Sequence, residues 1–255
     1  MSWNNVTSEL TVLLPDWPAP EWVRAGCSTR LGGVSETVWA SLNLGSHVQD
    51  EAAHVQENRR RLAHWAGIGA DRFYWLNQVH GTEVVHLPVN GVPDADASLT
   101  SEPGLACTVL TADCLPVLFC DQGGTRVAAA HAGWRGLCAG VLERTITALA
   151  CPPERLLAWL GPAIGPAHFE VGGEVRDAFA RQASEAELAF RPSPDRPGHY
   201  LANIYQLARQ RLQRMGVVQV YGGNDCTVAD ASRFYSYRRD GVTGRMASFI
   251  WLDRR

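Results

Sequence analysis

Two short apolar runs, separated by only three residues, place the tightest constraint on how this chain can fold. Residues 106–111 and 115–120 are almost entirely apolar or β-branched. Each run is too short for a buried helix, and a run without polar alternation is typical of a strand that is covered on both faces. The chain is therefore predicted to build a sheet that other elements enclose.

The rest of the chain mixes strand-like and helix-like patterns. Apolar residues at helical spacing predict helices at 51–66, 137–149, 174–181 and 204–215. Short apolar segments predict strands at 21–29, 73–76, 83–88, 126–130, 156–160 and 217–221. The pair Asp240-Gly241 predicts a hairpin that joins 235–238 to 246–251. Because these elements alternate irregularly, we predict an α+β fold with mixed sheets rather than a regular doubly wound sheet.

The length of 255 residues allows one large domain or two small ones. The only notable loop-like stretch is 191–198, in which three prolines and a glycine exclude a helix or a central strand. Strong motifs lie on both sides of it, so we interpret it as a surface excursion and predict a single domain over 1–255.

Charge and composition exclude several classes of partner. The chain contains no lysine, its net charge is −3, and it has no basic run, so a nucleic-acid surface is not indicated. No apolar stretch is long enough to span a membrane, and residues 1–10 do not resemble a signal peptide. The seven cysteines form no Cys-x-x-Cys pair, which favours reduced thiols. We therefore expect a cytoplasmic protein that acts on a small molecule.

Several familiar catalytic signatures are missing. The sequence has no Gly-x-Gly-x-x-Gly, no Walker A lysine, no His-Glu-x-x-His and no Gly-x-Ser-x-Gly. The His-x-Glu and Pro-Cys-x-x-Cys signature of cytidine-type zinc deaminases is also absent.

Three segments combine a reactive residue with glycines or a tight turn: Asn-Gln-Val-His-Gly at 77–81, Thr-Ala-Asp-Cys-Leu-Pro at 111–116, and His-Ala-Gly-Trp-Arg-Gly at 131–136. Their reactive residues are His80, Cys114 and His131. Two imidazoles and one thiolate suit Zn²⁺ with an open fourth position, and they also suit copper. The same residues could serve nucleophilic catalysis, with Cys114 attacking and His131 as its base. The residues alone leave both interpretations open.

The order of the motifs identifies a family. The relevant segments are 27–35, 41–45, 57–59, 77–81, 95–97, 111–118, 131–136, 161–165, 226–227 and 235–246. Together they cover nearly the whole chain, and they resemble the YfiH-like proteins. This family is also called the laccase-domain or multicopper polyphenol oxidase family, and its members are now described as purine nucleoside phosphorylases.

The resemblance implies a layered α/β/β/α sandwich related to the toxin-type (CNF/YfiH-like) cysteine hydrolase fold. It implies a catalytic metal, zinc or alternatively copper, bound by His80, Cys114 and His131. It further implies phosphorolysis of adenosine, inosine, guanosine and methylthioadenosine, together with deamination of adenosine. One bacterial branch of the family is linked to an amidase activity that edits peptidoglycan precursors.

The chain departs from the family pattern at three places. Ala167 and His168 stand where cysteines often follow the Gly-Pro-x-Ile-Gly-Pro loop. Val228 follows Cys226-Thr227, where another cysteine is common, and the usual Leu-Asp-Leu before a late helix is Leu-Ala-Asn at 201–203. None of these changes touches the three metal-type residues.

Substrate binding is expected to involve five further residues. Without lysine, arginine must hold a phosphate, and Arg30 and Arg135 are our candidates because a guanidinium matches phosphate oxygens. Asn43 and Gln78 are candidates for reading purine edges, and Asp113 for orienting His131 or a water. The expected ligands are purine nucleosides and phosphate, and the expected assembly is a monomer or small homo-oligomer.

Three rival functions remain. The first is a cysteine-dependent amidase or hydrolase with Cys114 as nucleophile and His131 as base. The second is a true multicopper laccase, which we rank low because the chain contains no His-x-His pair for a copper cluster. The third is a non-enzymatic binding domain, which the concentration of motifs at predicted strand ends disfavours.

Overall fold

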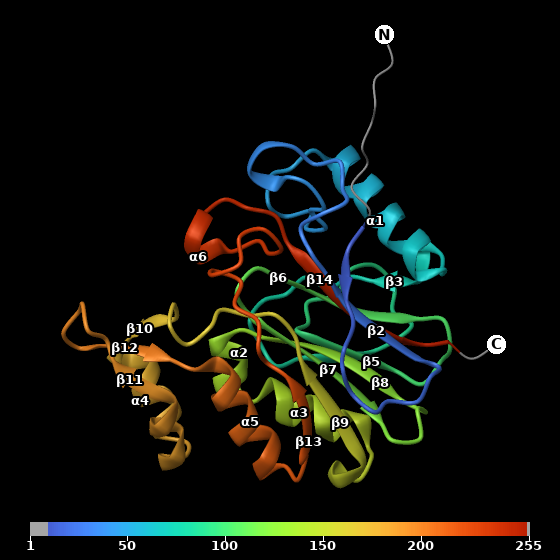
Figure 1. Ribbon diagram of the computed structural model, residues 1–255. Coiled ribbons are helices and arrows are strands. Elements are labelled where there is room, and N and C mark those ends of the chain that lie inside the picture. The colour runs from blue at the N-terminus through green and yellow to red at the C-terminus, as the bar shows by residue number, and fades with distance from the viewer. Residues whose placement is uncertain (1–9, 254–255) are drawn as a thin grey trace.

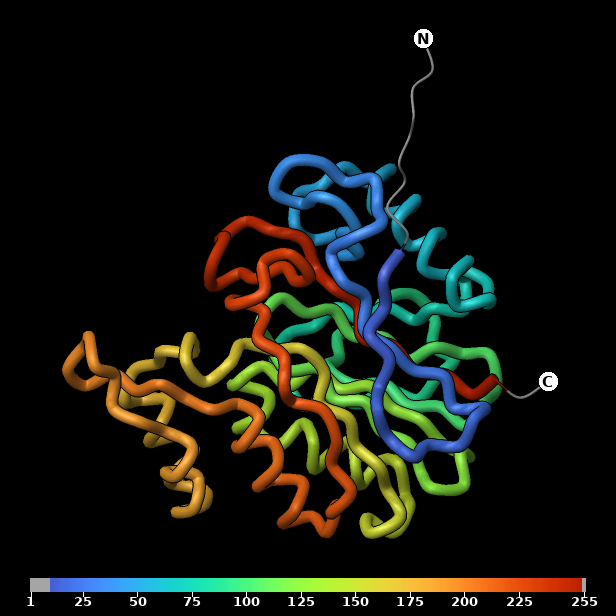
Figure 2. Tube along the Cα trace, viewed as in Figure 1, coloured from blue at the N-terminus to red at the C-terminus, as the bar shows by residue number. Residues whose placement is uncertain are grey.

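The computed structural model describes residues 10–253, and its strands form two large sheets and one small sheet (Figures 1 and 2). The expectation that no signal peptide is present concerns the first residues, most of which lie outside this range. Within the described range, no helix combines the length and the apolar character needed to cross a bilayer. The mixture of helices with parallel and antiparallel strand pairs agrees with the predicted α+β class.

The six-stranded sheet contains two strands that border the candidate site. In spatial order its strands are β13 (Gln219–Gly222), β9 (Leu156–Leu160), β7 (Leu115–Asp121), β8 (Val127–Ala132), β5 (Ala97–Thr100) and β4 (Val84–His86). The end pairs β13–β9 and β4–β5 are parallel, whereas the inner pairs are antiparallel. Every residue of β7 and β8 is buried, as the apolar run predicted for β7.

The five-stranded sheet has the last strand of the chain at its centre. Its order is β1 (Val12–Leu13), β2 (Val23–Ser28), β14 (Met246–Leu252), β6 (Ala106–Thr111) and β3 (Phe73–Tyr74). Strand β14 pairs antiparallel with both β2 and β6. The predicted hairpin between 235–238 and 246–251 is therefore wrong. Residues Tyr237–Asp240 form the short helix α6 instead, because the Ser236 hydroxyl accepts a hydrogen bond from the Arg239 amide and caps its first turn.

Three apolar clusters hold these sheets and the helices together. One cluster joins residues of the six-stranded sheet, such as Leu118 and Ala129, to residues of the five-stranded sheet, such as Val109 and Ile250. A second joins the six-stranded sheet to α3 (Val141–Leu149) and α5 (Ile204–Arg214). A third joins the five-stranded sheet to Leu62 of α1 (Ala52–Ala66). Both large sheets are thus covered on two faces by apolar residues, which accounts for their strands without polar alternation.

The main helices match the predicted positions, with one break. They are α1 (Ala52–Ala66), α2 (Trp134–Ala139), α3 (Val141–Leu149), α4 (Gly173–Ala180) and α5 (Ile204–Arg214). The single helix predicted over 137–149 is wrong, because Gly140 adopts a left-handed conformation (φ 103°) that ends α2 and starts α3. Within residues 10–253, four 3₁₀ turns complete the helical segments: Thr37–Trp39, Ala70–Arg72, Pro153–Arg155 and Ser184–Ala189.

The small sheet stands apart from the two large ones, at the left of Figures 1 and 2. Its order is β10 (Glu170–Gly172), β12 (His199–Ala202) and β11 (Phe190–Pro192), with α4 beside it. The proline-rich stretch predicted as a loop begins within β11. This is an edge strand, where Pro192 can be accommodated without breaking a ladder on both sides.

Candidate metal centre

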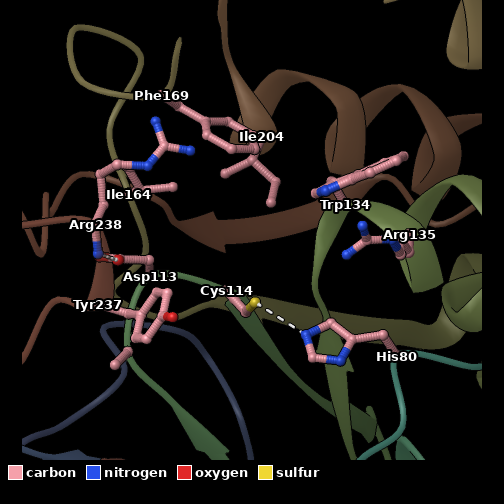
Figure 3. A pocket seen from close by; sticks show the side chains of 11 residues that line it. His80, Asp113, Cys114, Trp134, Arg135, Ile164, Phe169, Ile204, Tyr237 and Arg238 are labelled. Carbon is pink, nitrogen blue, oxygen red and sulfur yellow. Dashed lines mark hydrogen bonds between the residues drawn. The ribbon is translucent and has the colours of Figure 1, made fainter. Parts of the chain in front are cut away.

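His80, Cys114 and His131 come together although they are far apart in the chain. One candidate ligand atom from each lies within 4.8 Å of the other two. The His80 Nε2 atom is 3.9 Å from the Cys114 Sγ atom, and Figure 3 shows the ring and the sulfur facing each other. The two imidazole rings meet edge to face, with 4.8 Å between their centroids. The arrangement offers two nitrogens and one sulfur to a single point.

Two of these side chains lie in tight backbone turns. Cys114 lies in the turn between β6 and β7, where Asp113 has a φ of 95°. His80 itself has a φ of 59°, a left-handed conformation that non-glycine residues rarely adopt. His131 is different, because it belongs to the fully buried strand β8. Unusual backbone conformations at such positions are typical of functional sites.

Asp96 connects the two histidines. Its carboxylate accepts hydrogen bonds from the backbone amides of Val79 (3.2 Å), His80 (3.1 Å) and Gly81 (2.6 Å). The same carboxylate lies 2.7 Å from the Nδ1 atom of His131. One fully buried side chain therefore fixes the turn that carries His80 and also holds the ring of His131. Because Nδ1 of His131 donates to Asp96, Nε2 is the ring nitrogen that remains for binding a metal.

Two glycines make room for the cluster. A Cβ atom at Gly133 would lie 2.9 Å from the His80 ring and 3.0 Å from the Cys114 sulfur. A Cβ atom at Gly136 would lie 2.8 Å from the carbonyl oxygen of Gly81. The helix that follows His131 can approach the other two ligands only because these positions carry no side chain.

The electrostatics of the site favour a thiolate. Burial alone would raise the pKa of the Cys114 thiol, but the charges and hydrogen bonds of His131 and His80 outweigh it and lower the pKa to about 6. Burial would lower the pKa of His131, but the Cys114 thiolate and the Asp96 carboxylate more than compensate and raise it. The two groups thus stabilise each other as an anion and a cation.

The donor set fits a transition-metal ion. Two imidazoles, a thiolate and an Asp that orients one imidazole are the elements of a three-ligand site with room for a further ligand. His80 and Cys114 are accessible from the surface, whereas His131 is buried. These features fit zinc and also copper, and the ligands do not by themselves distinguish the two.

Two cavities adjoin the cluster. The first, of about 330 Å³, has an apolar wall that includes Trp134, Ile164, Phe169 and Ile204, as Figure 3 shows. The second, of about 480 Å³, is lined by His47, Gln78 and Arg245 among other residues. His80, Cys114 and Tyr237 border both cavities. We call the first the Trp134 cavity and the second the Arg245 cavity, and the candidate centre lies where they meet.

Asp113 lines the first cavity, and two other segments of the chain hold its carboxylate. The carboxylate accepts hydrogen bonds from the Thr227 hydroxyl (2.6 Å) and from the Arg238 amide (2.6 Å). Of the two partners expected for it, His131 or a water, His131 is held by Asp96. Asp113 thus ties the turn that carries Cys114 to the segment that carries Tyr237, and it shapes the cavity wall.

The other four predicted substrate-binding residues divide into two pairs. Arg135 and Gln78 each line a cavity, although the Gln78 amide is engaged with the backbone of Leu110, donating at 2.8 Å and accepting at 2.7 Å. Arg30 and Asn43 do not line either of these cavities. Arg30 donates to the carbonyl oxygens of Ala40 and Ala231. The Asn43 side chain is fully buried, so it is not placed to read a purine edge.

Sequence reasoning did not single out three residues of the site. Asp96 was visible only as part of a family motif, but an acidic residue directly before a buried strand is itself a signal. Tyr237 and Arg245 lie on segments that the sequence assigns to a hairpin and its end, so no local pattern indicated that they reach the cavities.

The fold and the cluster define a class: a mixed α+β protein with a His/Cys/His centre at a cavity mouth. The sequence matches the family model described as multi-copper polyphenol oxidoreductase laccase over residues 24–253. It is 59% identical to a purine nucleoside phosphorylase of Pseudomonas aeruginosa over 94% of this chain and 98% of that protein. It is 57% identical to the purine nucleoside phosphorylase YfiH of Escherichia coli, with the same coverage.

A crystal structure of Neisseria meningitidis protein NMB0706 superimposes with a TM-score of 0.91 at 52% sequence identity. The match covers 95% of this chain and 99% of that one. The chain therefore belongs to the YfiH family of laccase-like proteins.

Proposed function

We propose that this protein is a purine nucleoside phosphorylase acting on adenosine, inosine, guanosine and methylthioadenosine, with adenosine deaminase activity at the same site. The observation that carries the proposal is the convergence of His80, Cys114 and His131 between two cavities. The names of the relatives support the phosphorylase activity. The expected ligands are therefore a purine nucleoside and inorganic phosphate.

The residues suggest how substrate is held. The rings of Trp134 and Phe169, with Ile164 and Ile204, give an apolar wall of the kind that a purine base can pack against while water is excluded. In phosphorolysis a phosphate oxygen forms a bond to C1′, and the bond between C1′ and the base nitrogen breaks. The reaction requires the phosphate to be fixed on one side of the sugar while the base departs on the other.

His80, Cys114 and His131 would hold a zinc ion, or alternatively copper, and such an ion would supply Lewis-acid chemistry. Asp96 keeps the His131 ring in the orientation and tautomer that metal binding needs. A laccase reaction remains the weaker alternative, because these three residues are the one group of three or more His, Cys, Asp or Glu ligands found in residues 10–253.

The test is incubation of purified, zinc-loaded protein with adenosine and phosphate, with adenine and inosine quantified separately. Formation of adenine that depends on phosphate identifies phosphorolysis, and formation of inosine identifies deamination. Both should disappear in Cys114→Ala, whereas Cys151→Ala, which changes a partly exposed thiol outside the cluster, should retain them. Wild-type protein that forms neither product would contradict the proposal.

A second candidate, a cysteine amidase that edits peptidoglycan precursors, is favoured by a separate observation. A carboxylate, an imidazole and a thiol of lowered pKa lie side by side in Asp96, His131 and Cys114, as cysteine hydrolases require. In this reaction the Cys114 sulfur would attack an amide carbon, and the C–N bond would break as His131 passes a proton to the leaving amine. Water would then hydrolyse the resulting thioester, which releases the acid and restores the thiol. Activity that survives chelation but is abolished by alkylation of Cys114 would select this function over the first.

Five further properties belong to the same proposal. We expect one domain over 1–255, a cytoplasmic location, and a monomer or small homo-oligomer. We also expect the α/β/β/α layer order and the relation to toxin-type cysteine hydrolases, for which the three apolar clusters between sheets and helices provide support.

A further inference from the structure

Arg245 is an arginine that is partly buried beside the candidate centre without an ion-pair partner among the described residues. It lines the Arg245 cavity together with His47, His131 and Cys114. Burial lowers the pKa of its guanidinium, and the nearby charges of Cys114 and Asp113 offset this effect only in part. Among residues 10–253, no carboxylate forms an ion pair with it, in contrast to Arg211 and Arg233, which do have such partners.

The backbone around Arg245 is held by a neighbouring loop. The side-chain oxygen of Asn43 accepts a hydrogen bond from the Arg245 amide (2.9 Å), and the Leu44 amide donates to the Arg245 carbonyl oxygen (3.1 Å). A Cβ atom at Gly45 would lie 2.8 Å from Cγ of Arg245. The loop is thus shaped around this side chain, and the buried Asn43 is explained as a residue that positions Arg245.

The guanidinium has hydrogen-bonding capacity left for a ligand. Its Nη1 atom donates to the carbonyl oxygens of Thr243 (2.9 Å) and Gly244 (3.0 Å). In the part of the chain that the structure describes, no acceptor is recorded for its Nε and Nη2 atoms. Those two N–H groups form the edge with which arginine binds two oxygens of one anion.

His47 lies on the same loop and borders the same cavity. Burial and then the nearby guanidiniums of Arg245 and Arg59 lower the pKa of His47, so its imidazole is neutral at neutral pH. A neutral imidazole can donate one hydrogen bond to an anion without adding a second buried charge.

We infer that Arg245, assisted by His47, is the binding site for an inorganic oxyanion, and that this oxyanion is the phosphate substrate. The inference rests on the proposed phosphorolysis for the identity of the anion. It replaces Arg30 and Arg135, the arginines expected from the sequence. Arg30 is engaged with two carbonyl oxygens away from the cavities, and Arg135 is exposed beside the apolar wall with its guanidinium over the ring of Trp134.

The arrangement assigns the two cavities different roles. The Trp134 cavity takes the base against its apolar wall, the Arg245 cavity takes the phosphate, and His80 and Cys114 lie between them. Such a division places the nucleophile and the leaving group on opposite sides of the sugar, as an in-line displacement needs.

The test compares Arg245→Gln with Arg144→Gln, a matched change at an exposed arginine on α3 that borders a separate cavity. Initial rates are measured with phosphate and adenosine varied independently. Arg245→Gln should raise the KM for phosphate about 10- to 100-fold, the cost of a lost charge-assisted hydrogen-bond pair, and should change the KM for adenosine less than about threefold. Arg144→Gln should change neither. An unchanged phosphate KM in Arg245→Gln would overturn the inference.

Calorimetric titration of the zinc-loaded protein with inorganic phosphate separates this inference from the proposed reaction. Binding to wild type that is lost in Arg245→Gln supports the site even if no phosphorolysis occurs, in which case only the proposed function fails. Binding that persists in Arg245→Gln, or wild type that binds no phosphate, would refute the site. If Arg245→Gln does not fold, Arg245→Lys and His47→Ala replace it; Arg245→Lys should restore part of the affinity, because it keeps the charge but not the two-pronged edge.

Discussion

The pKa of a cysteine thiol is shifted in opposite directions in two regions that lie only a few residues apart in the chain. Burial in strands β6 and β7 raises the pKa of the Cys107 and Cys120 thiols to about 12. In the turn between these strands, His131 and His80 overcome burial and lower the pKa of Cys114 to about 6. Among these three cysteines, only the one that two imidazoles face has a lowered pKa, because burial alone acts in one direction only.

The largest expected effect comes from replacing Cys114, the cysteine whose pKa is lowered. Cys114→Ser keeps the size of the side chain but removes the soft ligand, so turnover of nucleosides should fall about a thousandfold or more. The melting temperature should change little, since the side chain is partly exposed. Steady-state kinetics together with metal analysis checks both statements. Full activity in Cys114→Ser would show that the sulfur has no part in the reaction.

The next effect is the difference in reactivity between the thiols. In chelator-treated protein, iodoacetamide should modify Cys114 at least about a hundredfold faster at pH 7 than Cys107 or Cys120. The lowered pKa means that the thiolate predominates above pH 6, so the rate should be level there and should fall about tenfold for each pH unit below it. Peptide mapping by mass spectrometry measures each site. Equal modification rates at the three cysteines would contradict the predicted difference in reactivity between Cys114 and the two buried thiols.

A smaller effect is expected from replacing Asp96, the carboxylate that holds His131 and the turn that carries His80. Asp96→Asn exchanges an anion for an amide beside His131, which should lower zinc affinity about 10- to 100-fold. Asp121→Asn is the matched control, since this buried carboxylate caps a turn at the other end of β7 and accepts from the Thr125 and Arg126 amides. Competition with a chromophoric chelator measures the affinities. Equal zinc affinity in the Asp96→Asn and Asp121→Asn proteins would show that Asp96 does not act through the metal site.

The smallest effect is expected from replacing Cys107, a cysteine whose pKa is raised. Cys107→Ala removes a fully buried sulfur and should cost about 1 kcal/mol in the free energy of unfolding, with nucleoside turnover unchanged. Urea denaturation and the coupled kinetic assay provide the two readings. A loss of turnover as large as that in Cys114→Ser would mean that the strand interior and the turn are not separate regions in function.

The sequence predicted the strands and the reactive residues better than the contacts among them. The runs at 106–111 and 115–120 could be predicted because burial on both faces leaves a continuous apolar pattern. His80, Cys114 and His131 were found because motifs surround them. The hairpin at 235–251 was predicted wrongly, because β14 finds its partners in β2 and β6, far away in the chain. Local turn signals carry no information on such pairing.

The supporting residues were harder to predict for the same reason. Asp96 acts through hydrogen bonds to the turn at 79–81 and to His131, which are separated from it by more than a dozen residues on either side. Asn43 holds a residue near the other end of the chain. The partners of Asp96 and Asn43 are visible only in the tertiary structure.

The central place of β14 has a consequence for biosynthesis. A ribosome makes this chain from its N-terminus, so β2 and β6 emerge long before the strand that lies between them. Their inner edges stay unpaired until residues 246–252 have left the exit tunnel, whereas β7 and β8 can zip together as soon as both have appeared. Nascent chains must therefore carry one half-built sheet until β14 has been made, which is the interval in which a chaperone would be of most use.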